Sequence, residues 1–103
     1  MVLKKWQLEY DVVDLKEYGI DNVAFDFPSA ISYMCEAMNQ GYIILGGDII
    51  VFENGRYTES GNSWWSDKKD PQETMKDALG YFSTLCNNNC FDFSWKISVI
   101  LAK

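Results

Sequence analysis

The chain of 103 residues has fifteen carboxylate side chains but no histidine. Histidine is the side chain whose ordinary pKa best suits general acid–base catalysis near neutral pH. Asp48 and Glu53 could in principle share acid and base roles, although such pairs occur in any acidic protein. The sequence also has no Gly-x-Ser-x-Gly motif and no phosphate-binding loop. We therefore expect no catalytic residues and regard enzymatic function as the least favoured class.

Three cysteines are present, without the spacing of a metal site. Because histidine is absent too, a zinc ion would lack its usual set of grouped ligands. Cys35 lies on the apolar side of a predicted helix. Cys86 and Cys90 flank three asparagines and could approach each other, but an odd cysteine count fits a reducing compartment better than a disulfide framework. The sequence therefore predicts no metal, no cofactor, and free thiols in preference to a disulfide.

The net charge is −6, and its distribution is uneven. Residues 9–62 carry ten acidic side chains against only Lys16 and Arg56, whereas residues 63–103 carry five of each sign. An acidic surface repels the phosphates of nucleic acid and attracts a basic protein partner. The charges therefore predict protein binding rather than nucleic-acid binding, with a solvated surface kept for solubility as the alternative.

The apolar content predicts one domain spanning residues 1–103, since 48% of the residues are hydrophobic and 16% are aromatic. No apolar run approaches the length of a membrane span, and the first residues do not have the pattern of a signal peptide. We expect a soluble cytoplasmic protein without a membrane partner. The sequence does not indicate the oligomeric state.

The elements that would position the charged residues centre on a strand from Tyr42 to Phe52. Its two aliphatic runs, rich in β-branched residues, predict a strand that is buried on both faces. Asn54-Gly55 supplies the two positive-φ positions of a type I′ turn. Phe52 and Tyr57 should therefore lie opposite each other in a tight hairpin.

Gly46 and Gly47 interrupt that strand, and Asp48 follows them directly. Glycine is unfavourable inside a strand, so the pair predicts a bulge or a bend. Asp48 is the one ionisable side chain between the two apolar runs. For Asp48 we favour hydrogen bonds from the bulged backbone or a neighbouring loop over direct contact with a partner, because a buried carboxylate must be satisfied.

Two helices are predicted on either side of the hairpin. The first has Asp26 near its start, Pro28 at its first helical position and Gly41 as its C-terminal stop. The second begins with an Asp-x-x-Glu capping box at Asp70 and ends at the asparagine run 87–89. Their expected apolar faces are Ile31, Met34, Cys35 and Met38 in the first helix, and Met75, Ala78, Leu79, Phe82, Leu85 and Cys86 in the second.

A last strand is predicted from Phe91 to Leu101, where polar and apolar residues alternate. The shorter predicted segments are residues 5–11 as a strand or a helix, residues 14–18 as one or two helical turns before Gly19, residues 22–25 as an extended connector and residues 60–63 as a loop. Together these elements predict an α+β fold. The sheet is mainly antiparallel, formed by the central bulged hairpin and the C-terminal strand, with the two main helices packed on one face.

Trp64 and Trp65 are adjacent, and neighbouring side chains in extended structure point to opposite sides. We expect one to lie in the core and the other to be at least partly exposed. An exposed tryptophan is an efficient interface anchor, because it offers a large rigid area and a polar atom. The alternative is that both cover the edge of the sheet.

Several of these features also occur together in a known family. They are the short acidic helical turn with Leu15 and Gly19, the proline-started helix, the block Ile44-Leu45-Gly46-Gly47-Asp48, the turn Glu53-Asn54-Gly55, and Asn62-Ser63-Trp64. From about Asp14 to Ser66 the chain resembles the bacterial polymorphic-toxin immunity proteins grouped as immunity protein 40, while the second helix and the last strand agree only in type. The resemblance implies a cytosolic inhibitor that binds a co-encoded toxin domain. Its pattern carries over only to Gly46, Gly47, Asp48 and Trp64, and it assigns no toxin contacts.

We therefore predict a non-catalytic immunity protein that neutralises a cognate toxin domain through an acidic, aromatic-bearing surface. The candidate partner-binding residues are Asp14, Glu17, Asp48, Glu53, Tyr57, Glu59, Trp64 and Trp65. The residues expected to act through the backbone are Gly46, Gly47, Asn54 and Gly55. If the toxin is a nuclease, the carboxylates could stand where substrate phosphates would bind. The alternative is an accessory or regulatory protein-protein interaction domain with no toxin partner.

Overall fold

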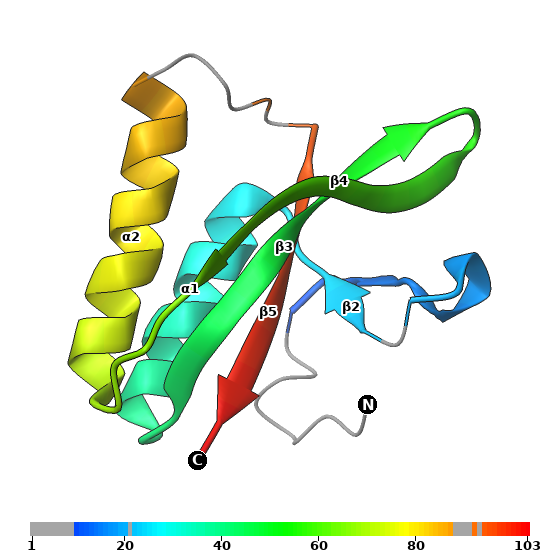
Figure 1. The fold of residues 1–103 in the computed structure, drawn as a ribbon. Coiled ribbons are helices and arrows are strands. Elements are labelled where there is room, and N and C mark those ends of the chain that lie inside the picture. The colour runs from blue at the N-terminus through cyan, green and yellow to red at the C-terminus, as the bar shows by residue number, and fades with distance from the viewer. Residues whose placement is uncertain (1–9, 21, 88–91, 93) are drawn as a thin grey trace.

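The computed structural model describes residues 10–20, 22–87, 92 and 94–103. A three-stranded antiparallel sheet of order β4-β3-β5 carries two helices on one face, and a short two-stranded hairpin lies beside it (Figure 1). The elements are β1 (Val13–Asp14), the 3₁₀ helix η2 (Lys16–Tyr18), β2 (Val23–Ala24), α1 (Phe27–Asn39), β3 (Ile43–Glu53), β4 (Arg56–Trp65), α2 (Pro71–Asn87) and β5 (Lys96–Ala102). The predicted α+β class and the placement of both helices on one face are confirmed.

The hairpin of β3 and β4 closes through the predicted type I′ turn. Asn54 and Gly55 have φ values of 54° and 78°, in the left-handed region that this turn requires. Phe52 pairs with Tyr57, and their ring centroids lie 4.9 Å apart. The predicted loop at residues 60–63 is wrong, because β4 continues through it with an irregularity in its pairing opposite β3.

The glycine pair in β3 lies at a bulge, as predicted. The register with β5 shifts between Ile44 and Gly46, so one extra residue enters the strand. Close packing is a second reason for the glycines. A Cβ on Gly46 would collide with the Trp64 carbonyl oxygen, and one on Gly47 would collide with the Trp64 ring and the Ser98 carbonyl oxygen.

Strand β3 is buried on both faces near its middle, in agreement with its apolar sequence. Ile49 belongs to the main core beneath the two helices, whereas its neighbour Ile50 packs with Leu15 and Ala24 on the opposite face. The β1–β2 hairpin therefore covers part of the sheet face that the helices leave open. Ser98 is buried for the same reason, and its hydroxyl donates to the Val23 carbonyl at 2.9 Å.

Helix α1 begins at Phe27, one residue before the predicted Pro28, and it ends before Gly41 as predicted. The Asp26 carboxylate accepts a hydrogen bond from the Ser29 amide at 2.8 Å, and Gly41 follows the helix with a φ of 84°. The predicted apolar face is displaced, however. The fully buried residues are Ala30, Tyr33, Met34 and Ala37, while Ile31, Cys35 and Met38 lie half-buried beside them. The small alanines allow the helix to approach the sheet closely.

Helix α2 begins with the predicted cap, in which Asp70 accepts a hydrogen bond from the Glu73 amide at 3.1 Å. Its predicted buried face is partly wrong, because Leu79 is 43% exposed and Cys86 is exposed. Thr74 is buried instead. Its hydroxyl accepts from the Ile44 amide at 3.0 Å and donates to the Pro71 carbonyl at 2.9 Å.

The C-terminal strand is shorter than predicted. Strand β5 begins at Lys96, after a backbone hydrogen bond from Trp95 to Asp92, so the predicted start at Phe91 is wrong. Gly19, with a φ of 84°, ends the predicted helical turn as a 3₁₀ helix. Residues 22–25 are extended and include β2. Most of the segment 5–11, together with Phe91, Phe93 and Cys90, lies outside the described residues.

Candidate functional site

The predicted acidic residues meet at one end of the molecule, where the 3₁₀ helix lies against the hairpin (Figure 1). The Tyr18 and Tyr57 ring centroids are 5.5 Å apart in an edge contact, and the Arg56 guanidinium donates to the Tyr18 carbonyl at 3.3 Å. The packing of Leu15 against Ile50 supports this contact from below. Residues more than thirty positions apart in sequence are thereby held side by side.

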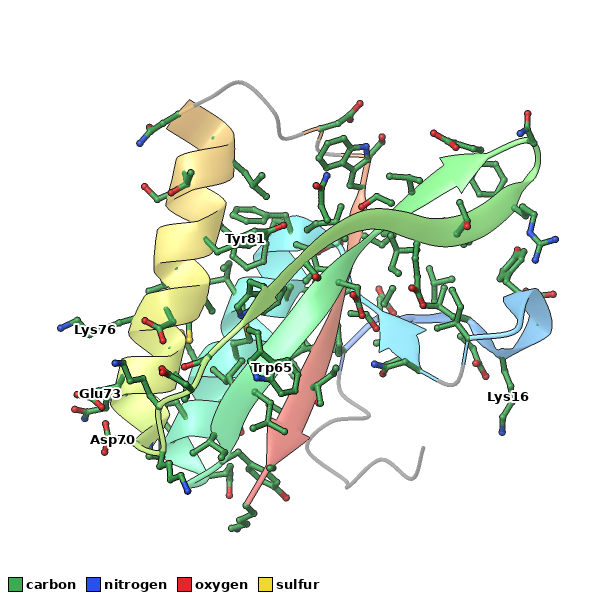
Figure 2. All side chains as sticks on the ribbon, in the orientation of Figure 1. Lys16, Trp65, Asp70, Glu73, Lys76 and Tyr81 are labelled. Atoms are coloured by element: carbon green, nitrogen blue, oxygen red, sulfur yellow. The ribbon has the colours of Figure 1, made fainter. Side chains whose placement is uncertain are left out.

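We define the acidic end as the exposed carboxylates Asp14, Glu17, Glu53 and Glu59 with the aromatic residues Phe52 and Tyr57. Within the described part of the chain, none of these four carboxylates forms an ion pair. Lys16 belongs to the same 3₁₀ helix but points away from the hairpin (Figure 2). Burial and the Glu17 charge raise the pKa of Tyr18, so this phenol stays neutral at physiological pH. The end is therefore acidic on balance, with four carboxylates against the two cations Lys16 and Arg56.

Phe52 is the residue of this surface that sequence reasoning missed. Its side chain is 56% exposed and stands against Tyr57, which is half-buried between Phe52 and Tyr18. The signal in the sequence was its position next to the turn. There the hairpin extends beyond the helices, and the residue opposite Phe52 is Tyr57. An exposed aromatic side chain among carboxylates is a favourable anchor for a protein partner.

The two tryptophans separate as predicted, one inside and one outside. Trp64 is 6% exposed and stacks on Tyr81 at 5.4 Å between ring centroids, with Phe82 at 5.1 Å. Trp64 is therefore part of the core rather than of a surface. Trp65 is 68% exposed and is the most exposed large hydrophobic side chain among the residues described.

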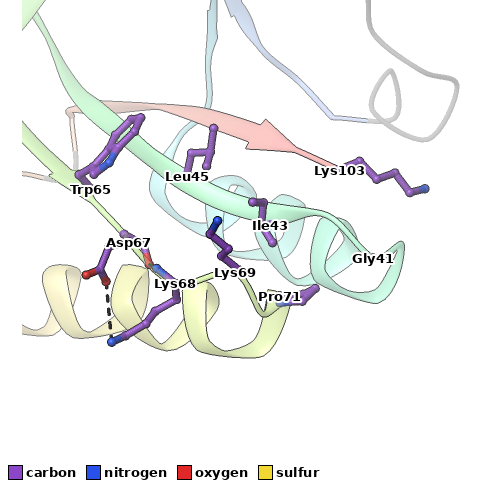
Figure 3. Close-up of a pocket in the computed structure, with 10 residues that line it drawn as sticks. Gly41, Ile43, Leu45, Trp65, Asp67, Lys68, Lys69, Pro71 and Lys103 are labelled. Atoms are coloured by element: carbon purple, nitrogen blue, oxygen red, sulfur yellow. Dashed lines mark hydrogen bonds and ion pairs between the residues drawn. The ribbon is translucent and has the colours of Figure 1, made fainter.

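Trp65 does not join the acidic end, contrary to the expectation of one acidic and aromatic surface. It pairs with Gly46 at the far end of β4, and Gly46 lies six residues, or roughly 20 Å, along β3 from Phe52. Trp65 lines a groove of about 560 Å³ with apolar residues and with Lys68, Lys69 and Lys103 (Figure 3).

Asp48 lies between these two surfaces, on the sheet face opposite the helices. It is half-buried and pairs across the sheet with Ser63 and Ser98. Among described residues its carboxylate accepts no hydrogen bond, so the favoured role as an acceptor from bulged backbone is not supported. Its charge acts at a distance, because burial first and the Asp48 charge second raise the pKa of Tyr81.

Neither a metal cluster nor a membrane-spanning helix occurs in the part of the chain that the structure describes. Within those residues, no group of three cysteine, aspartate or glutamate side chains is placed to hold a metal ion. No helix in the same ranges is both long and apolar enough to cross a membrane.

Comparison with known proteins agrees with the resemblance found in the sequence. A family model, described as immunity protein 40, matches residues 14–93. The match extends beyond Ser66 through α2, so the family pattern covers the helix that the motif residues did not reach. No curated protein and no solved structure matches the chain. Since the family model covers more than half of the sequence, the chain belongs to the immunity protein 40 family.

Proposed function

We propose that the chain neutralises its cognate toxin by binding it through the acidic end. Membership of an immunity family implies a toxin partner, and immunity proteins typically act by binding rather than by catalysis. The observation that supports this surface is that four exposed carboxylates, on β1, η2, β3 and β4, lie at the end of the molecule that carries Phe52, and that none has an ion-pair partner among the described residues. The complex forms in the cytoplasm, where the toxin would otherwise act.

The two parts of this surface have different roles in binding. The carboxylates accelerate encounter with a basic toxin surface and orient it, an effect that weakens as salt screens the charges. Phe52 and Tyr57 then supply apolar area that becomes dry in the complex. Because Tyr57 is already fixed between two rings, little side-chain freedom is lost when it is covered.

If the toxin is a nuclease, the acidic end would occupy the cleft in which its substrate phosphates bind. A nuclease cleft is basic, so four carboxylates match its charge. If the toxin belongs to another class, the acidic end would bind a basic surface elsewhere on it.

The first experiment is rescue of growth. The toxin domain encoded beside this protein is expressed with and without it, and we expect growth only when both are present. No rescue would instead favour an accessory or regulatory interaction domain. The affinity and association rate of the purified pair are then measured by surface plasmon resonance.

Charge reversal locates the surface. Glu53→Lys and Glu59→Lys should each lower the association rate and make it less sensitive to salt, because rim charges act mainly on encounter. Asp67→Lys is the matched control, since its side chain is 89% exposed and lies near Trp65 at the other end of β4. If Asp67→Lys lowers the rate as much as Glu53→Lys does, the acidic end is not the toxin surface.

A further inference from the structure

The two most exposed large hydrophobic side chains in the described ranges lie at opposite ends of one hairpin. Phe52 is 56% exposed at the tip of β3–β4, and Trp65 is 68% exposed at the end of β4. Phe52 precedes Glu53 and stands among carboxylates, whereas Trp65 stands beside lysines. The molecule therefore carries two apolar surfaces of opposite charge, roughly 20 Å apart along the hairpin.

We call the second surface the Trp65 groove. Figure 3 shows Trp65 and Leu45 together along one wall, with Lys69 rising from the loop toward Leu45. Lys68 turns away and pairs with Asp67 at 3.7 Å. The groove is lined by Gly41, Ile43, Leu45, Trp65, Ser66, Asp67, Lys68, Lys69, Pro71 and Lys103.

The charges of this groove define the chemistry of an occupant. The Lys69 ammonium has no ion-pair partner among the residues that the structure describes. The Lys103 ammonium lies over the Tyr42 ring, 4.8 Å from its centroid, and keeps its charge at the groove's other end. An apolar side chain next to a carboxylate would cover the Trp65 indole and pair with Lys69.

We propose that the Trp65 groove binds the acidic end of a second copy of this chain. The hairpin tip has the required chemistry, because Phe52 and Glu59 are both exposed and the register of the paired strands places them on one face. A symmetric contact between two grooves would instead bring lysines of both copies together. The charges therefore favour a head-to-tail contact, in which the tip of one copy enters the groove of the next.

Self-association of this kind competes with toxin binding. An acidic end held in another copy's groove cannot meet a toxin at the same time, so toxin would separate the copies by mass action. This consequence depends on the proposed function, whereas the contact between copies does not. The test below therefore uses the protein alone, and its failure would leave the toxin proposal untouched.

The test uses two variants that each lack one surface. The groove variant carries Trp65→Ala and Lys69→Glu, and the tip variant carries Phe52→Ala and Glu59→Lys. Sedimentation velocity should show wild-type mass rising with concentration and each variant remaining a monomer. A mixture of the two variants should form a pair of two chains and stop there, because each supplies the surface that the other lacks.

A matched control alters an exposed apolar residue and a lysine elsewhere. Leu79→Ala with Lys76→Glu changes the outer side of α2 and should associate like the wild type. Lys69→Glu alone should weaken association about fivefold, the upper range for an exposed ion pair. Circular dichroism confirms that each variant is folded before its mass is measured.

Three results would overturn the proposal. The first is a wild type that stays monomeric at every concentration, with no pair in the mixture of variants. The second is self-association that survives in the groove variant. The third is a monomeric wild type whose toxin binding is weakened by Trp65→Ala, which would assign the groove to an acidic segment of the toxin.

Discussion

Replacing Gly47 by alanine should destabilise the fold far more than the same change at Gly80. A Cβ on Gly47 would collide with the Ser98 carbonyl oxygen and with the Trp64 ring. The Ser98 backbone is fixed by the pairing of β3 with β5, and the Trp64 ring is fixed by its stacking on Tyr81. Neither can yield without a loss of core contacts.

The expected loss of stability in Gly47→Ala follows from this lack of space. Added volume in a packed core usually lowers the free energy of unfolding by about 1–3 kcal/mol, and a collision with backbone on one side and a buried ring on the other belongs at the upper end. For a domain of this size, a loss of about 3 kcal/mol corresponds to a melting temperature lower by roughly 12–24 °C.

Gly80 is the matched control because it lies in the exposed part of α2, where an added Cβ would have no atom within 4 Å. Alanine there should raise the free energy of unfolding by about 1 kcal/mol, since alanine has the higher helix propensity. Chemical denaturation and calorimetry measure both variants. Equal effects of the same sign at the two positions, or a fall of only a few degrees for Gly47→Ala, would refute the packing argument.

Two further predictions concern single hydrogen bonds. Thr74→Val should lower the free energy of unfolding by about 1–3 kcal/mol in denaturant titrations, because it leaves the buried Ile44 amide without an acceptor. Thr84→Val, on the exposed side of the same helix, should change it by less than about 0.5 kcal/mol. At Asp26, hydrogen bonding from Ser29 lowers the pKa from its ordinary value of 3.8. This stabilisation is present above the unfolded-state pKa and is lost as pH falls through the lower folded-state pKa. Asp26→Asn keeps the cap without a titrating group. As the pH is lowered, the free energy of unfolding should therefore decrease less steeply in this variant than in the wild type. Equal slopes against pH would contradict the assignment.

Local features of the fold could be predicted from the sequence because each depends on neighbouring residues. The Asn54-Gly55 turn and the cap at Asp70 require only the conformations of a few adjacent residues. The buried side of α2 could not be predicted in this way. A hydrophobic stripe favours Leu79, but the Ile44 amide at the start of β3 needs an acceptor, and Thr74 supplies it.

The arrangement of the candidate residues could not be predicted from the sequence. Asp14 and Glu59 lie on one surface because the Tyr18–Tyr57 contact brings distant segments together, and no local pattern encodes that contact. Trp65 was expected on the same surface as an aromatic anchor. The continuation of β4 through residues 60–63 carries it away instead, and the distance follows from the length of the strand.

The bulge in β3 changes which alternate residues of the strand face the helices. Ile44 and Ile49 are an odd number of residues apart, yet both reach the core beneath the helices. Deleting Leu45 would restore strict alternation. The side chains on one side of the deletion would then point to the opposite face of the sheet, with almost no change in composition. The extra residue thus allows both halves of one continuous strand to bury apolar side chains beneath the helices.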